Sequence, residues 1–110
     1  YGSEARYWQA IDDLNQATEI APERADAYLL RATAYRHVDS LELAAEDVNR
    51  SLALKPDDPD ALLERGIIHR LAGDDTSAWR DWLMVLEIAP DSPAANDARR
   101  NLERLYRKPE

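Results

Sequence analysis

The prolines of this chain recur at a fixed interval, and this interval constrains the fold more than any other feature. Pro22, Pro56 and Pro90 are spaced by 34 residues, twice in succession. Three further registers keep the same interval: Ala10, Ala44 and Ala78; Ile20, Leu54 and Ile88; and Leu14, Val48 and Trp82. A period of this length is typical of chains built from stacked copies of one supersecondary unit. We therefore expect repeats rather than one irregular core.

Each complete repeat has the pattern of two helices separated by a short break. Gly73 suits the left-handed conformation that ends a helix. Asp58 is a capping residue placed directly before Pro59, which suits the first helical position. Asp39 followed by Glu42 predicts a capping box. The expected helices cover about residues 4–20, 25–37, 41–54, 59–72, 75–88 and 93–107.

The residues in register resemble the tetratricopeptide repeat, whose pattern is Trp-x2-Leu-Gly-x2-Tyr, then Ala-x3-Phe, then Pro. The matching positions are Tyr28, Arg31, Ala32, Tyr35, Ala44, Val48 and Pro56 in one unit, and Leu62, Arg65, Gly66, His69, Ala78, Trp82 and Pro90 in the next. The resemblance covers nearly the whole chain and implies an all-α fold, a right-handed α-α superhelix of helical hairpins with about six helices. The expected divisions of this single domain, 1–110, are a half repeat at 1–24, full repeats at 25–58 and 59–92, and a closing helix at 93–110.

Two departures from the family pattern also recur in register. Arginine stands where the family usually has an apolar residue, and aspartate recurs on the second helices: Arg31, Arg65 and Arg99, with Asp13, Asp47 and Asp81. A lone guanidinium between packed helices is costly. We therefore expect each arginine to pair with an aspartate of its own or the preceding hairpin. The alternative is that both sets reach solvent along their aliphatic stems.

The resemblance implies that the first helix of each hairpin lines a concave, partner-binding groove. Carried over by register, the candidate groove residues are Leu29, Thr33, Arg36, Leu63, Ile67 and Arg70. An apolar strip edged by arginines favours a peptide with apolar anchors and acidic groups. The alternative is that the row of Arg36, Arg70 and Arg104 is only a solvated face.

Recognition of a chaperone tail is not expected. Members of the family that bind chaperones grip a C-terminal carboxylate with lysine and asparagine residues. Those residues have no counterparts here at Leu29, Leu30, Thr33 and Leu63. The resemblance therefore implies a protein or peptide partner without naming it.

A second candidate surface lies on the first expected helix, which has no hairpin partner of its own. It carries Tyr7, Trp8, Ile11 and Leu14, and the first three are the candidates for self-association. Uncovered apolar side chains mark an interface or a truncation. The alternative function is therefore a structural segment of a larger array, or a homo-oligomer formed through this N-terminal helix.

The sequence offers no pattern for catalysis, for a metal or for a cofactor. Cysteine is absent, and His37 and His69 lack the spacing of a zinc site. A net charge of −8 repels phosphate backbones, so nucleic acid is not an expected partner. No apolar stretch is long enough for insertion into a membrane. We expect a non-catalytic protein–protein interaction module, soluble in either the cytoplasm or the periplasm.

Overall fold

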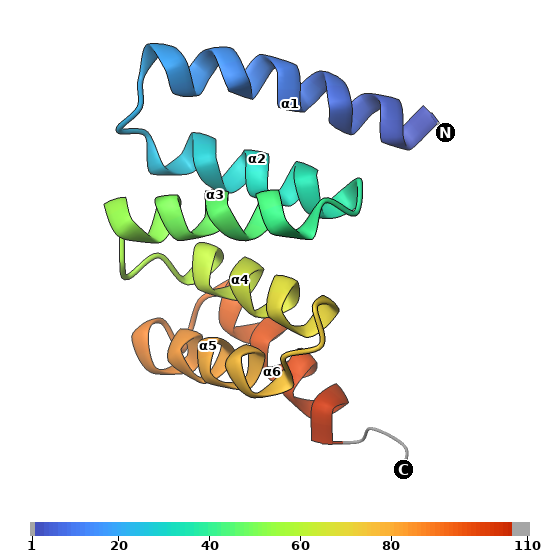
Figure 1. The fold of residues 1–110 in the computed structure, drawn as a ribbon. Helices are drawn as coiled ribbons and strands as arrows, with labels where there is room; N and C mark the ends of the chain where they lie inside the picture. The colour runs from blue at the N-terminus through green and yellow to red at the C-terminus, as the bar shows by residue number, and fades with distance from the viewer. Residues whose placement is uncertain (1, 107–110) are drawn as a thin grey trace. The chain divides into compact units, whose positions relative to one another are not determined.

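The computed structural model describes residues 2–106, which form helices joined by short turns (Figure 1). The helices are α1 (Gly2–Ile20), α2 (Ala25–His37), α3 (Leu41–Leu54), α4 (Pro59–Leu71), α5 (Asp75–Ile88) and α6 (Pro93–Tyr106). No strand occurs in this range, so the all-α expectation is confirmed. The bounds lie within two residues of the expected ones, and residue 107, the expected end of the last helix, falls outside the described range.

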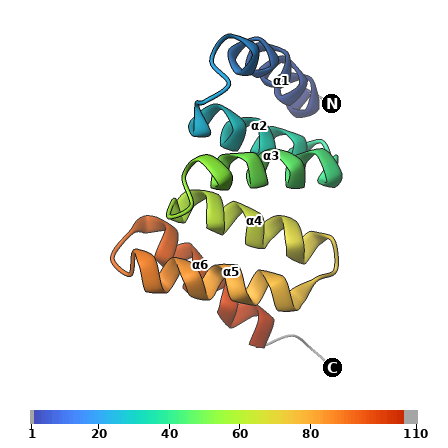
Figure 2. The same ribbon diagram turned by 60° about the vertical axis from the view of Figure 1, so that its left-hand side comes forward.

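The helices group into two compact units, α1 to α3 and α4 to α6, divided after Pro56. In the first unit α2 packs against both α1 and α3. In the second unit α5 packs against both α4 and α6, and α4 also contacts α6. Figures 1 and 2 show the consecutive helices of each unit side by side in both views. Each unit is therefore one helical hairpin with one additional helix, and the assignment of residues 1–110 to a single domain stays a prediction.

The turn after the first helix of each hairpin needs a residue with a left-handed backbone. Gly73 has φ of 90°, as expected, and Asp39, one repeat earlier, has φ of 66°. Asp39 therefore ends α2 instead of opening α3, and the predicted capping box is wrong. The N-cap of α3 is Ser40, whose side chain makes no capping hydrogen bond. Glycine adopts this conformation without strain, and aspartate is among the few other residues that tolerate it.

Side-chain caps begin the two helices of the second hairpin. The carboxylate of Asp58 accepts a hydrogen bond from the amide of Asp60 at 3.0 Å. The carboxylate of Asp74 accepts from the amide of Ser77 at 3.1 Å and from its hydroxyl at 2.7 Å. These bonds satisfy amide groups that have no partner inside the helix. The cap at Asp58 was expected, whereas the one at Asp74 was not identified from the sequence.

The cap at Asp74 makes the stability of the second hairpin depend on pH. The hydrogen bonds from the side chain and amide of Ser77 lower the pKa of Asp74. A lowered pKa stabilises the fold above the unfolded value of about 3.9, and this contribution is lost as the pH falls through the folded value. We predict that Asp74→Ala lowers the Tm at pH 7 and that the difference from the parent narrows below about pH 4. Thermal unfolding followed by circular dichroism checks this, with the exposed Asp91→Ala as control; an equal difference at pH 7 and pH 3 would contradict it.

Candidate functional site

Two of the three expected arginine–aspartate pairs form, each inside one hairpin. Arg31 of α2 donates from Nε and Nη2 to the two carboxylate oxygens of Asp47 on α3, at 2.7 and 2.8 Å. Arg65 of α4 makes the same two hydrogen bonds to Asp81 of α5, at 2.9 and 3.0 Å. In each unit the arginine on the first helix of the hairpin therefore pairs with the aspartate on the second helix of the same hairpin. Because the pair recurs in both units, we interpret it as structural.

Arg99 and Asp13, the remaining residues of these two registers, do not pair with each other or with the other arginines and aspartates of the registers. Arg99 donates to the backbone carbonyl of Pro90 at 2.7 Å and to the side chain of Asn96 at 3.0 Å. Asp13 lies exposed on α1 and forms no ion pair with any residue in the range 2–106. The expectation that each arginine pairs with an aspartate is thus wrong at Arg99, because Asp81, the aspartate of the preceding hairpin, is bound by Arg65 instead.

Two of the three candidate groove residues of the second unit line a pocket of about 300 Å³. Ile67 and Arg70 of α4 line it together with two residues of α6 from the same registers, Asn101 and Arg104. Leu71 and Trp82 complete its lining. Among the described residues, neither Arg70 nor Arg104 forms an ion pair. The pocket therefore combines an apolar wall with two guanidinium groups that can bind a ligand's carboxylate.

Leu63, the other candidate on α4, is half-buried and is not part of this pocket lining. Its backbone carbonyl instead accepts a hydrogen bond from Nε1 of Trp82 at 3.3 Å. Trp82, which the sequence analysis interpreted as a core residue, is 1% exposed and yet contributes to the pocket. The only sequence signal for this second role is its position between two helices that both carry candidate residues.

The candidate residues of the first unit do not share one pocket. Leu29, Thr33 and Arg36 lie on α2, and all three are half-buried. The hydroxyl of Thr33 donates to the carbonyl of Leu29 at 3.1 Å, and Arg36 also has an interaction partner. Thr33 lines a pocket of about 270 Å³, together with Tyr7, Ala10, Leu14, Leu30 and Ala34.

The three residues considered for self-association differ in exposure. Ile11 is 3% exposed and belongs to a core cluster with Ala34 and Val38. Tyr7 packs against that cluster and stacks on His37 with ring centroids 4.3 Å apart. Trp8 is 47% exposed. Of the three, Trp8 presents the most surface to solvent, and self-association through this helix stays a prediction.

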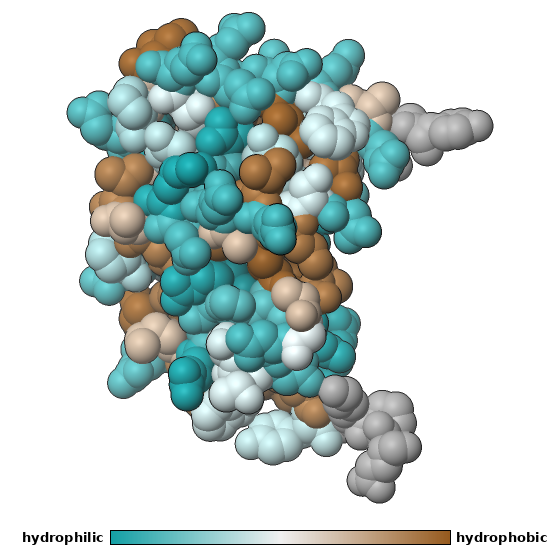
Figure 3. Space-filling model, in the orientation of Figure 1, coloured by the Kyte–Doolittle hydropathy of each residue, from teal (hydrophilic) through white to brown (hydrophobic). Residues whose placement is uncertain are grey.

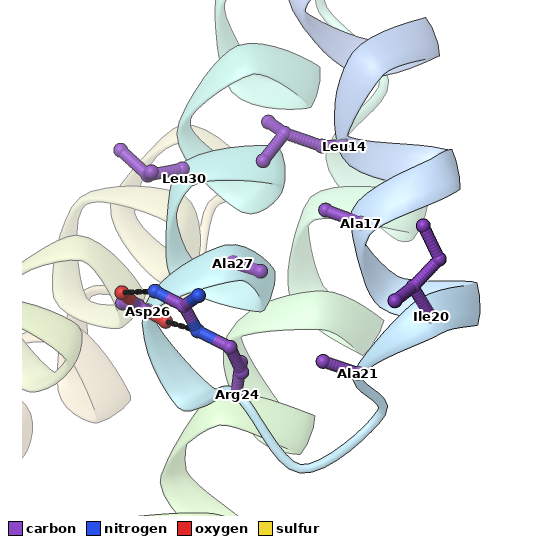
Figure 4. A pocket seen from close by; sticks show the side chains of 8 residues that line it. All are labelled: Leu14, Ala17, Ile20, Ala21, Arg24, Asp26, Ala27 and Leu30. Carbon is purple, nitrogen blue, oxygen red and sulfur yellow. Dashed lines mark hydrogen bonds and ion pairs between the residues drawn. The ribbon is translucent and has the colours of Figure 1, made fainter.

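A further pocket, of about 280 Å³, opens between α1 and α2 (Figure 4). Figure 4 shows Leu14 and Ala17 on α1 pointing toward α2, which carries Ala27 and Leu30. The hydrogen-bonded pair of Arg24 and Asp26 lies at its edge. This pocket and the one that includes Thr33 share Leu14 and Leu30. The sequence analysis placed Leu14 on the uncovered apolar surface of the first helix and did not name Leu30 as a site residue. Together they form a continuous apolar face along α1 and α2.

Large apolar side chains reach the surface at several places in the described range. On the face shown in Figure 3, aliphatic side chains form brown areas among teal, hydrophilic ones. The large apolar residues that are exposed are Trp8, Ile20, Leu30, Leu43, Leu54, Leu71, Trp79, Leu83, Met84 and Tyr106. Exposed apolar side chains mark interaction surfaces when they are contiguous. Ile20 and Leu30 are both exposed and line the same pocket.

Residues 2–106 contain no group of three or more side chains with the arrangement of a metal site. His69 lies with Nε2 3.6 Å from the carboxylate of Asp81, which also binds Arg65. His69 thus adjoins a structural ion pair, which agrees with its interpretation as a packing residue. None of the described helices has the length and apolarity needed to cross a bilayer.

The fold is similar to that of solved tetratricopeptide repeat (TPR) domains. The first TPR domain of the human RPAP3 protein is 27% identical, with a TM-score of 0.82 over 98% of this chain and 86% of that one. The first TPR of Spaghetti (RPAP3), solved with the HSP90 peptide SRMEEVD, is 26% identical, with a TM-score of 0.81 over 96% and 85%. The Arabidopsis OM64 TPR domain is 20% identical, with a TM-score of 0.81 over 91% and 83%. No family model and no curated protein matches the sequence.

Proposed function

Because this chain has the fold of a tetratricopeptide repeat domain, we propose that it is a non-catalytic module that binds an acidic peptide or protein segment. The observation that carries this proposal is the pocket lined by Ile67, Arg70, Trp82 and Arg104. Its two arginines come from different helices of one unit, so a bound carboxylate would meet guanidinium groups from two directions. Arginine binds carboxylates in a bidentate geometry, which gives orientation as well as affinity.

The apolar part of the pocket complements this charge. Ile67, Leu71 and Trp82 offer an aliphatic and aromatic wall to a leucine- or isoleucine-sized anchor. Peptides that bind helical grooves combine such anchors with charged neighbours. The ligand that fits best therefore carries an apolar residue close to one or more acidic side chains.

The peptide bound to the first TPR of Spaghetti, SRMEEVD, is itself acidic at its end. That likeness supports a peptide ligand for this chain and an acidic one in particular. Leu29, Leu30, Thr33 and Leu63 lack the side chains with which chaperone-binding members grip a terminal carboxylate. We therefore place the acid-binding role on Arg70 and Arg104, with Leu29, Thr33, Arg36 and Leu63 as candidate contacts elsewhere along the peptide.

We predict that Arg70→Ala/Arg104→Ala weakens binding of acidic peptides at least about tenfold, since hydrogen bonds to charged groups contribute about 1.5–3 kcal/mol each. The measurement is an array of peptides with one leucine anchor and flanking aspartate or glutamate residues, probed with the labelled protein. A parallel array carries lysine in place of the acidic residues. The control, Arg6→Ala/Arg80→Ala, removes two exposed arginines and changes the net charge equally. Equal binding by the parent and the pocket variant, or equal binding of both arrays, would contradict the proposal.

The second candidate function is self-association or packing within a larger array through α1. The exposure of Trp8 on that helix favours it. Sedimentation at two protein concentrations tests self-association directly. A monomer at both concentrations would exclude a homo-oligomer as the function of this chain over that range.

A further inference from the structure

The polar side chains in the pocket of the proposed function differ from the other arginines of the second unit in having no partner. Arg65 binds Asp81, Arg99 donates to the carbonyl of Pro90, and Arg100 binds a carboxylate on its own helix. Within residues 2–106, the side chains of Arg70, Asn101 and Arg104 form no hydrogen bond or ion pair. Arg70 and Asn101 are half-buried, and Arg104 is exposed. Their donor groups are therefore available to a ligand.

The pocket carries positive charge that its own lining does not neutralise. The lining residues include no acid: Ile67, Arg70, Leu71, Trp82, Asn101 and Arg104. Asp97, one helical turn before Asn101 on α6, is bound by Arg100. The pocket is thus a local exception in a chain whose net charge is −8. A doubly charged anion would balance its two guanidinium groups, whereas a single carboxylate would leave one of them unpaired.

Access to this pocket does not depend on the helices that flank the second unit. α5 packs on α4 and still leaves Ile67 and Arg70 of α4 in the pocket lining. Asn101 and Arg104 of α6 occupy the same registers, 34 residues later. A helix packed on α6 in the way that α5 packs on α4 would therefore leave these two residues accessible as well.

The donors in the pocket outnumber the acceptor positions of one carboxylate. A guanidinium presents five N–H groups and a carboxamide two. A carboxylate has two oxygens in one plane and pairs best with a single arginine through both. A phosphoryl group presents three terminal oxygens and carries a charge of about −1.5 to −2 at pH 7. It can accept hydrogen bonds from Arg70, Arg104 and the amide of Asn101 at the same time.

We propose that this pocket binds a phosphorylated serine or threonine side chain of a peptide that also carries an apolar anchor. The inference rests on the proposed function and specifies the acidic group of its ligand. The phosphoryl oxygens accept hydrogen bonds from Arg70 and Arg104, which come from two different helices, and from Asn101. The apolar anchor packs against Ile67 and Leu71.

Phosphate groups also occur on lipid headgroups, but the charge of the chain disfavours that source. The anionic surface of a membrane repels a protein with a net charge of −8. A short peptide brings only its own few charges to the pocket. The apolar wall beside the arginines suits a side chain next to the phosphorylated residue. A phosphopeptide is therefore the favoured ligand.

The test compares three fluorescent peptides that differ at one position beside a leucine, which is phosphoserine, glutamate or serine. By fluorescence anisotropy at about pH 7.5, we expect the phosphoserine peptide to bind at least about tenfold more tightly than the glutamate peptide. Because the second pKa of phosphoserine is about 6, this advantage should shrink as the pH is lowered to about 5. The glutamate peptide keeps its charge over that range and serves as the control for changes in the protein.

Asn101→Asp tests the contribution of the pocket with almost no change of shape. It adds a negative charge beside the ligand, so it should weaken binding of the phosphoserine peptide more than that of the glutamate peptide. The matched control is Asn96→Asp, at an exposed position of the same helix where Arg99 donates to the side chain. This control should leave both affinities unchanged. Arg70→Ala/Arg104→Ala should weaken binding of both peptides.

The outcomes separate this inference from the proposed function. Equal affinity for the phosphoserine and glutamate peptides, lost for both in Arg70→Ala/Arg104→Ala, overturns the inference and leaves the proposed function standing. Absence of binding to either peptide overturns both. A preference for phosphoserine that survives Arg70→Ala/Arg104→Ala, or that Asn96→Asp reduces as much as Asn101→Asp, also overturns the inference. So does tighter binding to phosphatidylcholine vesicles that contain a phosphatidylinositol phosphate than to the phosphoserine peptide.

Discussion

Replacing Arg31 with methionine is expected to lower the free energy of unfolding by about 3–5 kcal/mol. Asp47 is 1% exposed, and Arg31 donates to both of its carboxylate oxygens. Without that guanidinium the carboxylate keeps only Arg50, which lies half exposed at 2.8 Å. Arg31 also donates from Nη1 to Asn15 and Thr18, so the variant loses the hydrogen bonds that join α2 to α1. Urea denaturation followed by circular dichroism measures the effect.

Two further variants test whether the buried carboxylate causes this loss. Arg24→Met removes an arginine of an exposed pair and should leave the urea midpoint close to that of the parent. Arg31→Met/Asp47→Leu removes both charges and should be more stable than Arg31→Met alone, because no uncompensated charge then remains buried. If the single variant is as stable as the parent, the pair contributes nothing to stability. If the double variant is no more stable than the single one, the cost does not come from Asp47.

Gly66→Ala is expected to destabilise the second unit by about 1–3 kcal/mol through overpacking. A Cβ at this position would overlap the indole of Trp82, lying 2.6 Å from Cδ1 and closer still to Nε1. Trp82 is buried and hydrogen-bonded to the carbonyl of Leu63, so the ring has little room to move. The intrinsic preference of a helix for alanine over glycine, about 1 kcal/mol, acts in the opposite direction. The clash outweighs it because the overlap is with a fixed ring.

The hairpin of the first unit indicates which second substitution should relieve the clash caused by Gly66→Ala. One repeat earlier the same two registers hold Ala32 and Val48, a small residue opposite a short side chain. In a Trp82→Val background we therefore expect Gly66→Ala to be neutral or stabilising. A double-mutant cycle by urea denaturation gives this coupling energy. A loss from Gly66→Ala that is equal in both backgrounds would show that the indole is not its cause.

The helices themselves could be predicted closely from the sequence because their signals are local. The prolines at the repeat period, the caps and Gly73 fixed each boundary to within two residues. The exception was Asp39, a residue that caps helices and also tolerates a left-handed backbone. Sequence alone did not distinguish these two uses. Its repeat counterpart is Gly73, and both residues make the same turn. The glycine therefore indicated that Asp39 would adopt a left-handed backbone.

The candidate sites were predicted less completely, because exposure depends on what packs alongside. Register placed Arg70 and Arg104 in one row, and both line one pocket with the groove candidate Ile67. The same reasoning grouped Ile11 with Trp8, although Ile11 is buried in the core of the first unit. Helical spacing defines a face, but the neighbouring helix determines which residues of that face remain open.

The 34-residue interval therefore determined the all-α hairpin architecture, since few folds can satisfy prolines, small residues and apolar positions that all recur together. It also predicted that arginine and aspartate would pair. Only the tertiary structure decided that each pair closes within one hairpin and that Asp13 has none. It also decided that Ala98 is buried in the second unit, whereas Leu30, in the same register of the first unit, is 59% exposed and lines a pocket. The physical reason is that a sequence register is identical in every repeat, whereas burial is set by the helices that are present beside it.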